Sequence, residues 1–330
     1  MNTFKKILSK YLLIWLTITC ILAYNWSGLQ SASCGMIPAW FCPFHVPGWV
    51  MQAMVAVTML AIGSLLPVEE VKQVIRRWPR ILGGTAVQFI SMPLLAYLMG
   101  KAFHLEGPWF IGIILVGCVP GAMASNMLTM ISRGNVSYSV GLTTSSTLLS
   151  PLMVPLLLAY FLSATVKMDV SKISCDLLLT VVCPVVIGFS FSRLITWWRL
   201  TAQQLGEIVA NIVIIWIIAS VSAKNAGNLG STPVIVAVAL LCMNIAGYAS
   251  GWLGGWTIGL DDRMRRALTL EVGMQNAGLG TYLATTYFAN EPKAAIVCAM
   301  YTFGCMFTGI VLAQLFGLIP TKDSTLQEYK

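Results

Sequence analysis

Long apolar segments separated by short polar loops constrain this chain more than any other feature. A helix that crosses a bilayer needs about 20 largely apolar residues. The 330 residues have a mean hydropathy of +0.80 and only 10% charged side chains, against about 25% in soluble domains. The sequence therefore predicts an all-α integral membrane protein with ten transmembrane helices, at about 9–25, 48–67, 82–103, 108–132, 137–163, 175–195, 207–222, 233–259, 267–289 and 293–317.

The net charge of +8 is explained by basic loops that orient the protein in the membrane, so no nucleic-acid partner is expected. Fifteen of the 20 Lys and Arg residues, including every Arg, fall in the loops on one side of the predicted spans. Because cytoplasmic loops are enriched in Lys and Arg, both termini are expected in the cytoplasm, with the protein multi-pass in the cell's inner membrane. The basic N-terminus resembles a signal peptide, but no clean cleavage site follows, so it is interpreted as the first span.

Ten spans divide into five plus five. With an odd number of spans in each half, a duplicated unit inserts its second copy upside down. The predicted halves are residues 1–163 and 164–330, and they make the fourth and ninth spans equivalent. Those two spans carry the most unusual polar sequences in the chain, which is the internal support for an inverted repeat.

The fourth span is interrupted by Pro120-Gly121. Proline removes a backbone donor, so the helix is expected to unwind there and free carbonyl groups. Non-helical backbone at membrane depth is tolerated only against protein or a water-filled cavity. Ser125 and Asn126 follow directly and supply neutral oxygen atoms.

The ninth span contains Glu271, the only carboxylate that we place deep inside a long apolar segment, within Glu271–Gly278. An intramembrane acid is a functional-site hypothesis by default. Carbonyls, amides, hydroxyls and one carboxylate suit a hard cation, and a single carboxylate fits Na⁺ better than Ca²⁺. Two simpler interpretations remain: the breaks are kinks that serve helix packing, or Glu271 pairs with a basic residue.

Other polar residues in the spans have simpler explanations. Gln88 is expected to bond a neighbouring helix. Most hydroxyls of the run Thr143–Thr147 are expected to bond carbonyls of their own helix, with one or two facing a site. No CxxC pair is present, and Cys34 and Cys42 share one polar loop in which a disulfide is plausible.

With these motifs the chain resembles the bile acid:sodium symporter family. The resemblance rests on Gly117–Gly121 through Ser125-Asn126, Arg133-Gly134-Asn135, Ser145–Pro151 and Glu271–Asn276, and covers about residues 48–317. It implies a core domain from spans 3–5 and 8–10 and a panel domain from spans 1–2 and 6–7. The two broken helices would cross at the centre of the core.

The resemblance also implies two sodium sites. One would comprise Ser125, Asn126, Ser139, Thr143 and Glu271; the other would comprise Gln88, Glu271 and Gln275 with the backbone carbonyls of Val272 and Met274. Asn126 and Asn276 would also face the substrate. Two departures concern substrate identity: Met123 stands where many bacterial relatives carry a hydroxyl, and Cys305 where some carry a polar residue facing the cavity.

The resemblance implies Na⁺-coupled symport of a small organic anion, such as a bile acid-like compound, a steroid conjugate or a pantoate-like carboxylate, by alternating access. A proton-coupled carrier or a Na⁺/H⁺ antiporter that uses Glu271 is the alternative. Arsenite export would need a Cys just after the Pro of the fourth span, whereas Cys118 precedes Pro120. No His lies in a span, so an enzyme is not expected. A non-transporting membrane receptor stays open.

Overall fold

A computed structural model describes residues 11–26, 43–44, 47–67, 78–163, 166, 168–225 and 232–320; Cys34 and Cys42 lie outside them. These residues form helices only, apart from one isolated bridge. In chain order the helices are α2 (Leu12–Tyr24), α4 (Gly48–Leu65), α6 (Trp78–Ala102), α7 (Gly107–Cys118), α8 (Ala124–Ile131), α9 (Val136–Leu162), α10 (Val170–Leu177), the π-helical turn η1 (Leu178–Val182), α11 (Cys183–Leu194), α12 (Thr196–Lys224), α14 (Val234–Thr257), α15 (Asp262–Gly273), α16 (Ala277–Tyr287) and α17 (Lys293–Leu318).

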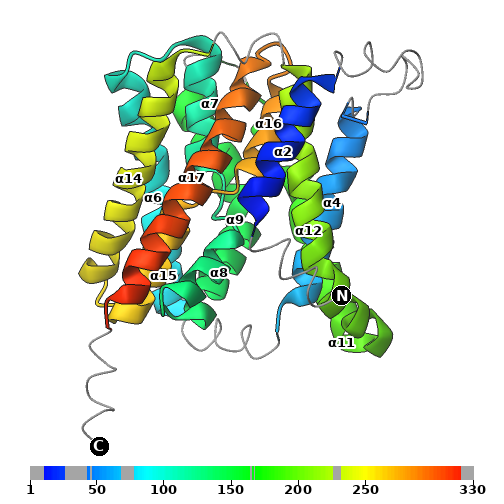
Figure 1. Cartoon of the computed structure of the whole chain (residues 1–330), viewed down its shortest axis with the longest axis vertical. Coiled ribbons are helices and arrows are strands. Elements are labelled where there is room, and N and C mark those ends of the chain that lie inside the picture. Colours follow the sequence, from blue (N-terminus) through cyan, green and yellow to red (C-terminus); the bar gives the residue numbers. More distant parts are fainter. Residues whose placement is uncertain are drawn as a thin grey trace, which may run out of the picture.

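Seven of the described helical segments are long and apolar enough to cross a membrane: α4, α6, α9, the continuous segment α10–η1–α11, α12, α14 and α17. Each contains a window of 18 residues with a mean hydropathy of at least 1.2. They run roughly along one axis (Figure 1). The prediction of an all-α, multi-pass membrane protein is confirmed.

The predicted fourth and ninth spans are each split into two short helices. α7 ends at Cys118 and α8 begins at Ala124, on either side of Pro120-Gly121; α15 ends at Gly273 and α16 begins at Ala277. In Figure 1, α7 and α16 lie in the upper half of the bundle, and α8 and α15 lie in the lower half. Both breaks therefore fall near mid-height, where the sequence predicts them.

Side-chain caps define where several of these helices start. Asn135 accepts a hydrogen bond from the Tyr138 amide at the start of α9, and Asp261 accepts one from the Met264 amide at the start of α15. Such caps satisfy backbone donors that have no partner within the helix. Asn276 performs the same role inside the second break, because its Oδ1 accepts from the Leu279 amide at 3.1 Å.

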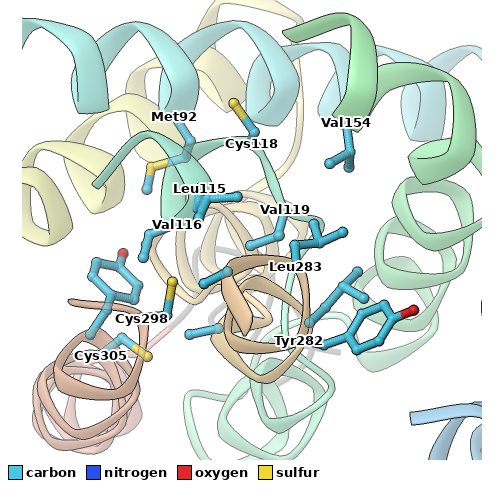
Figure 2. Close-up of a cluster of buried hydrophobic side chains, with 14 of the residues drawn as sticks. Met92, Leu115, Val116, Cys118, Val119, Val154, Tyr282, Leu283, Cys298 and Cys305 are labelled. Carbon is cyan, nitrogen blue, oxygen red and sulfur yellow. The ribbon is translucent and has the colours of Figure 1, made fainter. Parts of the chain in front are cut away.

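A cluster of buried hydrophobic side chains packs around the residues that lead into the first break. Cys118 and Val119 lead into Pro120 and are almost fully buried, together with Leu283 of α16 and Cys298 of α17. Figure 2 shows Val119 beside Leu283 in this cluster. The unwound backbone is thus surrounded by protein, as irregular backbone at membrane depth requires.

The described Arg and Lys residues lie at opposite ends of the bundle. Every described Arg lies at the lower end of Figure 1, near the start of α6, the end of α8, the α11–α12 junction and the start of α15. Every described Lys lies at the opposite end: Lys101, Lys172, Lys224 and Lys293. The arginine-rich end is thus chemically distinct from the lysine-bearing end.

Candidate ion and substrate site

The two breaks meet and hydrogen-bond to each other through their backbones. The Ala122 amide donates to the Met274 carbonyl at 2.7 Å, and the Asn276 amide donates to the Pro120 carbonyl at 2.8 Å. Gly121 and Gln275 form an isolated antiparallel bridge between them. Backbone groups that two uninterrupted helices would satisfy internally are therefore satisfied across the crossing.

Gly121 leaves the space that the Glu271 side chain occupies. A Cβ atom at position 121 would lie 2.1 Å from Glu271 Oε1 and 2.7 Å from its Cδ. Gly121 is not among the residues with positive φ, so the requirement for glycine here is steric. The Pro-Gly pair thus opens the fourth span and admits the carboxylate of the ninth.

Two hydroxyl groups hold the carboxylate of Glu271, which is fully buried. Ser125 Oγ donates to Oε2 at 2.5 Å, and Thr143 Oγ1 lies 2.7 and 2.9 Å from the two carboxylate oxygens. Among the described residues no Lys, Arg or His forms an ion pair with Glu271. Pairing with a basic side chain is therefore not how the described structure accommodates this charge.

The remaining residues of the first predicted sodium site surround Thr143. Asn126 Oδ1 lies 3.5 Å from Thr143 Oγ1, and the Ser139 carbonyl lies 3.1 Å from it. The Ser139 hydroxyl instead accepts from Thr129 Oγ1 at 3.2 Å. Ser139 thus contacts the group through its backbone, and its side chain faces a hydroxyl that the sequence did not single out.

The second predicted site lies on the other side of the break. Gln275 Nε2 donates to the Val272 carbonyl at 2.7 Å, and Gln88 Nε2 donates to Gln275 Oε1 at 3.4 Å. The Met274 carbonyl accepts from Ala122. Gln88 Oε1 is buried without a hydrogen-bond partner. Because a buried acceptor without a partner is costly, this amide oxygen suits a cation or a water molecule.

A cavity lies next to the first predicted sodium site, and its two facing walls differ in polarity. One wall is formed by the first break and α9, through Met123, Asn126, Val140, Thr143, Thr144 and Thr147. The facing wall is apolar and is formed by the end of α4 and by α11, through Ile62, Leu65, Leu66, Pro67 and Val185. None of these lining residues is charged.

The four predicted substrate residues are not all brought together. Asn126 and Met123 line this cavity. Asn276 is half-buried at the crossing, where its side-chain oxygen caps α16. Cys305 is 2% exposed and lies in a separate groove between α14 and α17, beside Asn244 and Tyr301.

The sequence expected one or two hydroxyls of the run Thr143–Thr147 to face a site, without saying which. Thr143, Thr144 and Thr147 line the cavity, and their spacing from Val140 on one helical face was a usable signal. Asp176 lies on α10 and is the second residue of the predicted span 175–195; the sequence analysis gave it no role. Asp176 accepts hydrogen bonds from Gln52, Thr180, Tyr282 and Tyr287, and these neutral donors explain how an acid is tolerated there.

Crossed, mutually bonded half-helices around a buried carboxylate are typical of secondary transporters. The sequence profile of the Sodium Bile acid symporter family matches residues 52–232. The chain belongs to this family.

Three curated relatives agree with that assignment. The chain is 28% identical over 300 residues to "Uncharacterized sodium-dependent transporter YocS" of Bacillus subtilis, covering 91% of this chain and 88% of that protein. It is 31% identical over 307 residues to "Probable sodium/metabolite cotransporter BASS1, chloroplastic" of Arabidopsis thaliana, covering 92% and 72%. It is 27% identical over 281 residues to human "Sodium/bile acid cotransporter 4", covering 82% and 63%. The protein is a member of a sodium-dependent transporter family, not an enzyme.

Proposed function

We propose that this protein imports a small organic anion together with Na⁺. The observation that carries the proposal is the buried Glu271 at the crossing of the two breaks, held by neutral hydroxyls and without an ion pair to any described basic residue. An uncompensated charge in the membrane is costly, and a bound cation would offset it. Na⁺ suits the surrounding set of carboxylate, hydroxyl, amide and carbonyl oxygens.

The two proposed ion sites share Glu271. The first uses Ser125, Asn126, Ser139, Thr143 and Glu271; the second uses Gln88, Glu271 and Gln275 with the carbonyls of Val272 and Met274. The contacts between Ser125, Thr143 and Glu271 support the first. The buried Gln88 Oε1 without a partner supports the second.

Charge bookkeeping favours an anionic substrate. One carboxylate and two Na⁺ leave the site with a net charge of about +1, which a monovalent anion would neutralise. The amide of Asn126 and the hydroxyls of Thr144 and Thr147 are neutral groups that can donate to an anionic head. The facing wall of Ile62, Leu65 and Val185 would accept an apolar body, as in a steroid conjugate or a branched carboxylate. Asn276, Met123 and Cys305 remain proposed contributors to substrate choice.

For the mechanism we propose alternating access between two domains. Counting α7–α8 and α15–α16 as one span each, and α2 as another, gives ten spans in two inverted halves, residues 1–163 and 164–330. α6–α9 and α14–α17 would form the core, and α2, α4 and α10–α12 would form the panel. The cavity lies between α8–α9 and α4–α11, which supports a boundary between the two proposed domains there. The arginine-rich end, with both termini, is proposed to face the cytoplasm of the inner membrane.

The direct test compares Na⁺ with K⁺ at equal ionic strength. A ligand that binds only the native state raises its apparent stability, so Na⁺ should raise the melting temperature of the purified protein, and one member of an organic-anion panel should raise it further. The Na⁺ effect should be lost in Glu271→Ala. It should be retained in the control Glu106→Ala, which removes an exposed carboxylate before α7.

Uptake into sealed proteoliposomes then tests transport with the anion found in that panel. Uptake should require an inward Na⁺ gradient in the wild type and be lost in Glu271→Gln. A dependence on pH without a dependence on Na⁺ would contradict symport and favour the proton-coupled carrier. Binding without accumulation would favour the receptor.

A further inference from the structure

The carbonyl of Gly273, in the second break, is held by two side chains from neighbouring helices. Asn244 of α14 donates to it through Nδ2 at 2.7 Å, and Tyr301 of α17 donates through its hydroxyl at 2.8 Å. Asn244 and Tyr301 are only 2% and 1% exposed. Hydrogen bonds between buried groups exchange little with solvent, so these two donors fix the direction of the Gly273 carbonyl.

The neighbouring carbonyls are bonded within the crossing itself. The Val272 carbonyl accepts from the Gln275 side chain, and the Met274 carbonyl accepts from the Ala122 amide. The two side-chain bonds to the Gly273 carbonyl come instead from α14 and α17. Because adjacent peptide planes share a Cα atom, rotation of the Gly273 carbonyl would redirect the carbonyls of Val272 and Met274 on either side.

The donor orientation of Asn244 is itself determined by a neighbour. Thr308 Oγ1 donates to Asn244 Oδ1 at 2.6 Å, which leaves the Nδ2 group directed at Gly273. Tyr248 also belongs to this polar cluster: its hydroxyl lies 3.1 Å from Thr308 Oγ1 and 3.3 Å from the Cys305 carbonyl. No hydrogen bond joins the Tyr248 hydroxyl to the Gly273 carbonyl in the described structure.

We propose that Asn244 and Tyr301 are positioning residues for the ion site, acting through the Gly273 carbonyl. This inference rests on the proposed Na⁺ coupling. Neither residue belongs to the proposed ligand sets. They hold the unwound backbone so that the Val272 and Met274 carbonyls and the Glu271 side chain keep one arrangement, which spares the protein the cost of ordering them when the ion binds.

Tyr301→Phe tests this with little change of shape, and Tyr248→Phe is its matched control. Each removes one buried hydroxyl from the same cluster and keeps the ring, but of the two hydroxyls only that of Tyr301 donates to the Gly273 carbonyl. Both variants should lose a similar amount of stability in KCl. Tyr301→Phe should also raise the NaCl concentration needed for half-maximal thermal stabilisation by about fivefold, the factor that corresponds to one typical hydrogen bond, while Tyr248→Phe should leave it within about twofold of the wild type.

The outcomes separate this inference from the proposed function. If the wild type shows no Na⁺-specific stabilisation, the proposed function fails. If the wild type shows it and Tyr301→Phe has the wild-type Na⁺ dependence, or Tyr248→Phe is shifted equally, the positioning role is refuted and the cluster serves stability alone. The double variant Asn244→Ala with Tyr301→Phe should shift the Na⁺ dependence further than Tyr301→Phe alone.

Discussion

The fit between Gly121 and Glu271 can be tested by a double-mutant cycle. In Gly121→Ala the new Cβ would lie 2.1 Å from Glu271 Oε1, whereas ordinary contact begins near 3.4 Å. The carboxylate oxygen must therefore move by about 1.3 Å, from 3.4 minus 2.1. A movement of that size away from its partners would break the bonds from Ser125 and Thr143, now 2.5 and 2.7 Å long.

The expected cost follows from those bonds. A hydrogen bond to a charged group contributes about 1.5–3 kcal/mol, so Gly121→Ala should lower the free energy of unfolding by about 2–4 kcal/mol after partial relaxation. In a Glu271→Ala background the clashing atoms are absent. Position 121 does not require positive φ, so the same substitution should there be neutral or slightly stabilising. The predicted coupling is therefore about 2–4 kcal/mol.

Chemical unfolding in detergent micelles, in K⁺ without Na⁺, measures all four corners of this cycle. Gly304→Ala is the control, because a Cβ at that position of α17 meets nothing within 4 Å; its effect should add to that of Glu271→Ala. Additivity of Gly121→Ala and Glu271→Ala within about 0.5 kcal/mol would refute the steric account of the Pro-Gly break.

Two further predictions concern residues of α15. Gly273→Ala should lower stability by about 1–3 kcal/mol, because its Cβ would lie 2.2 Å from the Tyr248 ring; Tyr248→Leu should recover part of this loss in unfolding experiments, and no recovery would contradict the assigned clash. Arg266→Lys should cost about 1–3 kcal/mol, because a single ammonium cannot reproduce the guanidinium fork that donates to the carbonyls of Ser132, Phe316 and Ile319. An unfolding curve identical to that of the wild type would refute this role.

The helices and the depth of both breaks could be predicted from hydropathy and a few residues. Pro120 and the polar run after Glu271 place the interruptions correctly, because they are local backbone effects. α12 differs: it begins at Thr196, whereas the predicted span begins near 207. Residues 196–206 are too polar for a span, yet nothing in them stops a helix, and Trp197 and Trp198 suit the membrane interface.

The direction that side chains face in nearly uniform apolar helices could not be predicted. α17 is apolar all round, so its sequence contains no stripe that fixes its rotation, and Cys305 lies in the groove beside α14. Pairing between the breaks was equally inaccessible, because it joins residues 122 and 274 through the backbone and leaves no side-chain signature. Asn244 was detectable in the sequence as a lone amide in an apolar helix. Its partner was not, because that partner is the backbone carbonyl of Gly273.

The carboxylates of Glu271 and Asp176 differ in how fully their acceptor sites are occupied by hydrogen-bond donors. A carboxylate offers about four lone-pair sites. Asp176 receives donors from four side chains, whereas Glu271 receives them from two among the described residues, Ser125 and Thr143. Glu271 therefore retains acceptor capacity for a cation, and Asp176 has none to spare.

This contrast predicts that replacing each carboxylate by its amide has a different effect on stability in Na⁺ and K⁺. Asp176→Asn should lower stability equally in Na⁺ and K⁺, because an amide accepts poorly from four donors at once. Glu271→Gln should abolish the stability difference between the two salts. Thermal unfolding of both variants in matched NaCl and KCl distinguishes the roles. If Asp176→Asn lost the Na⁺ effect and Glu271→Gln retained it, the cation would bind at Asp176. That result would refute the argument from acceptor capacity.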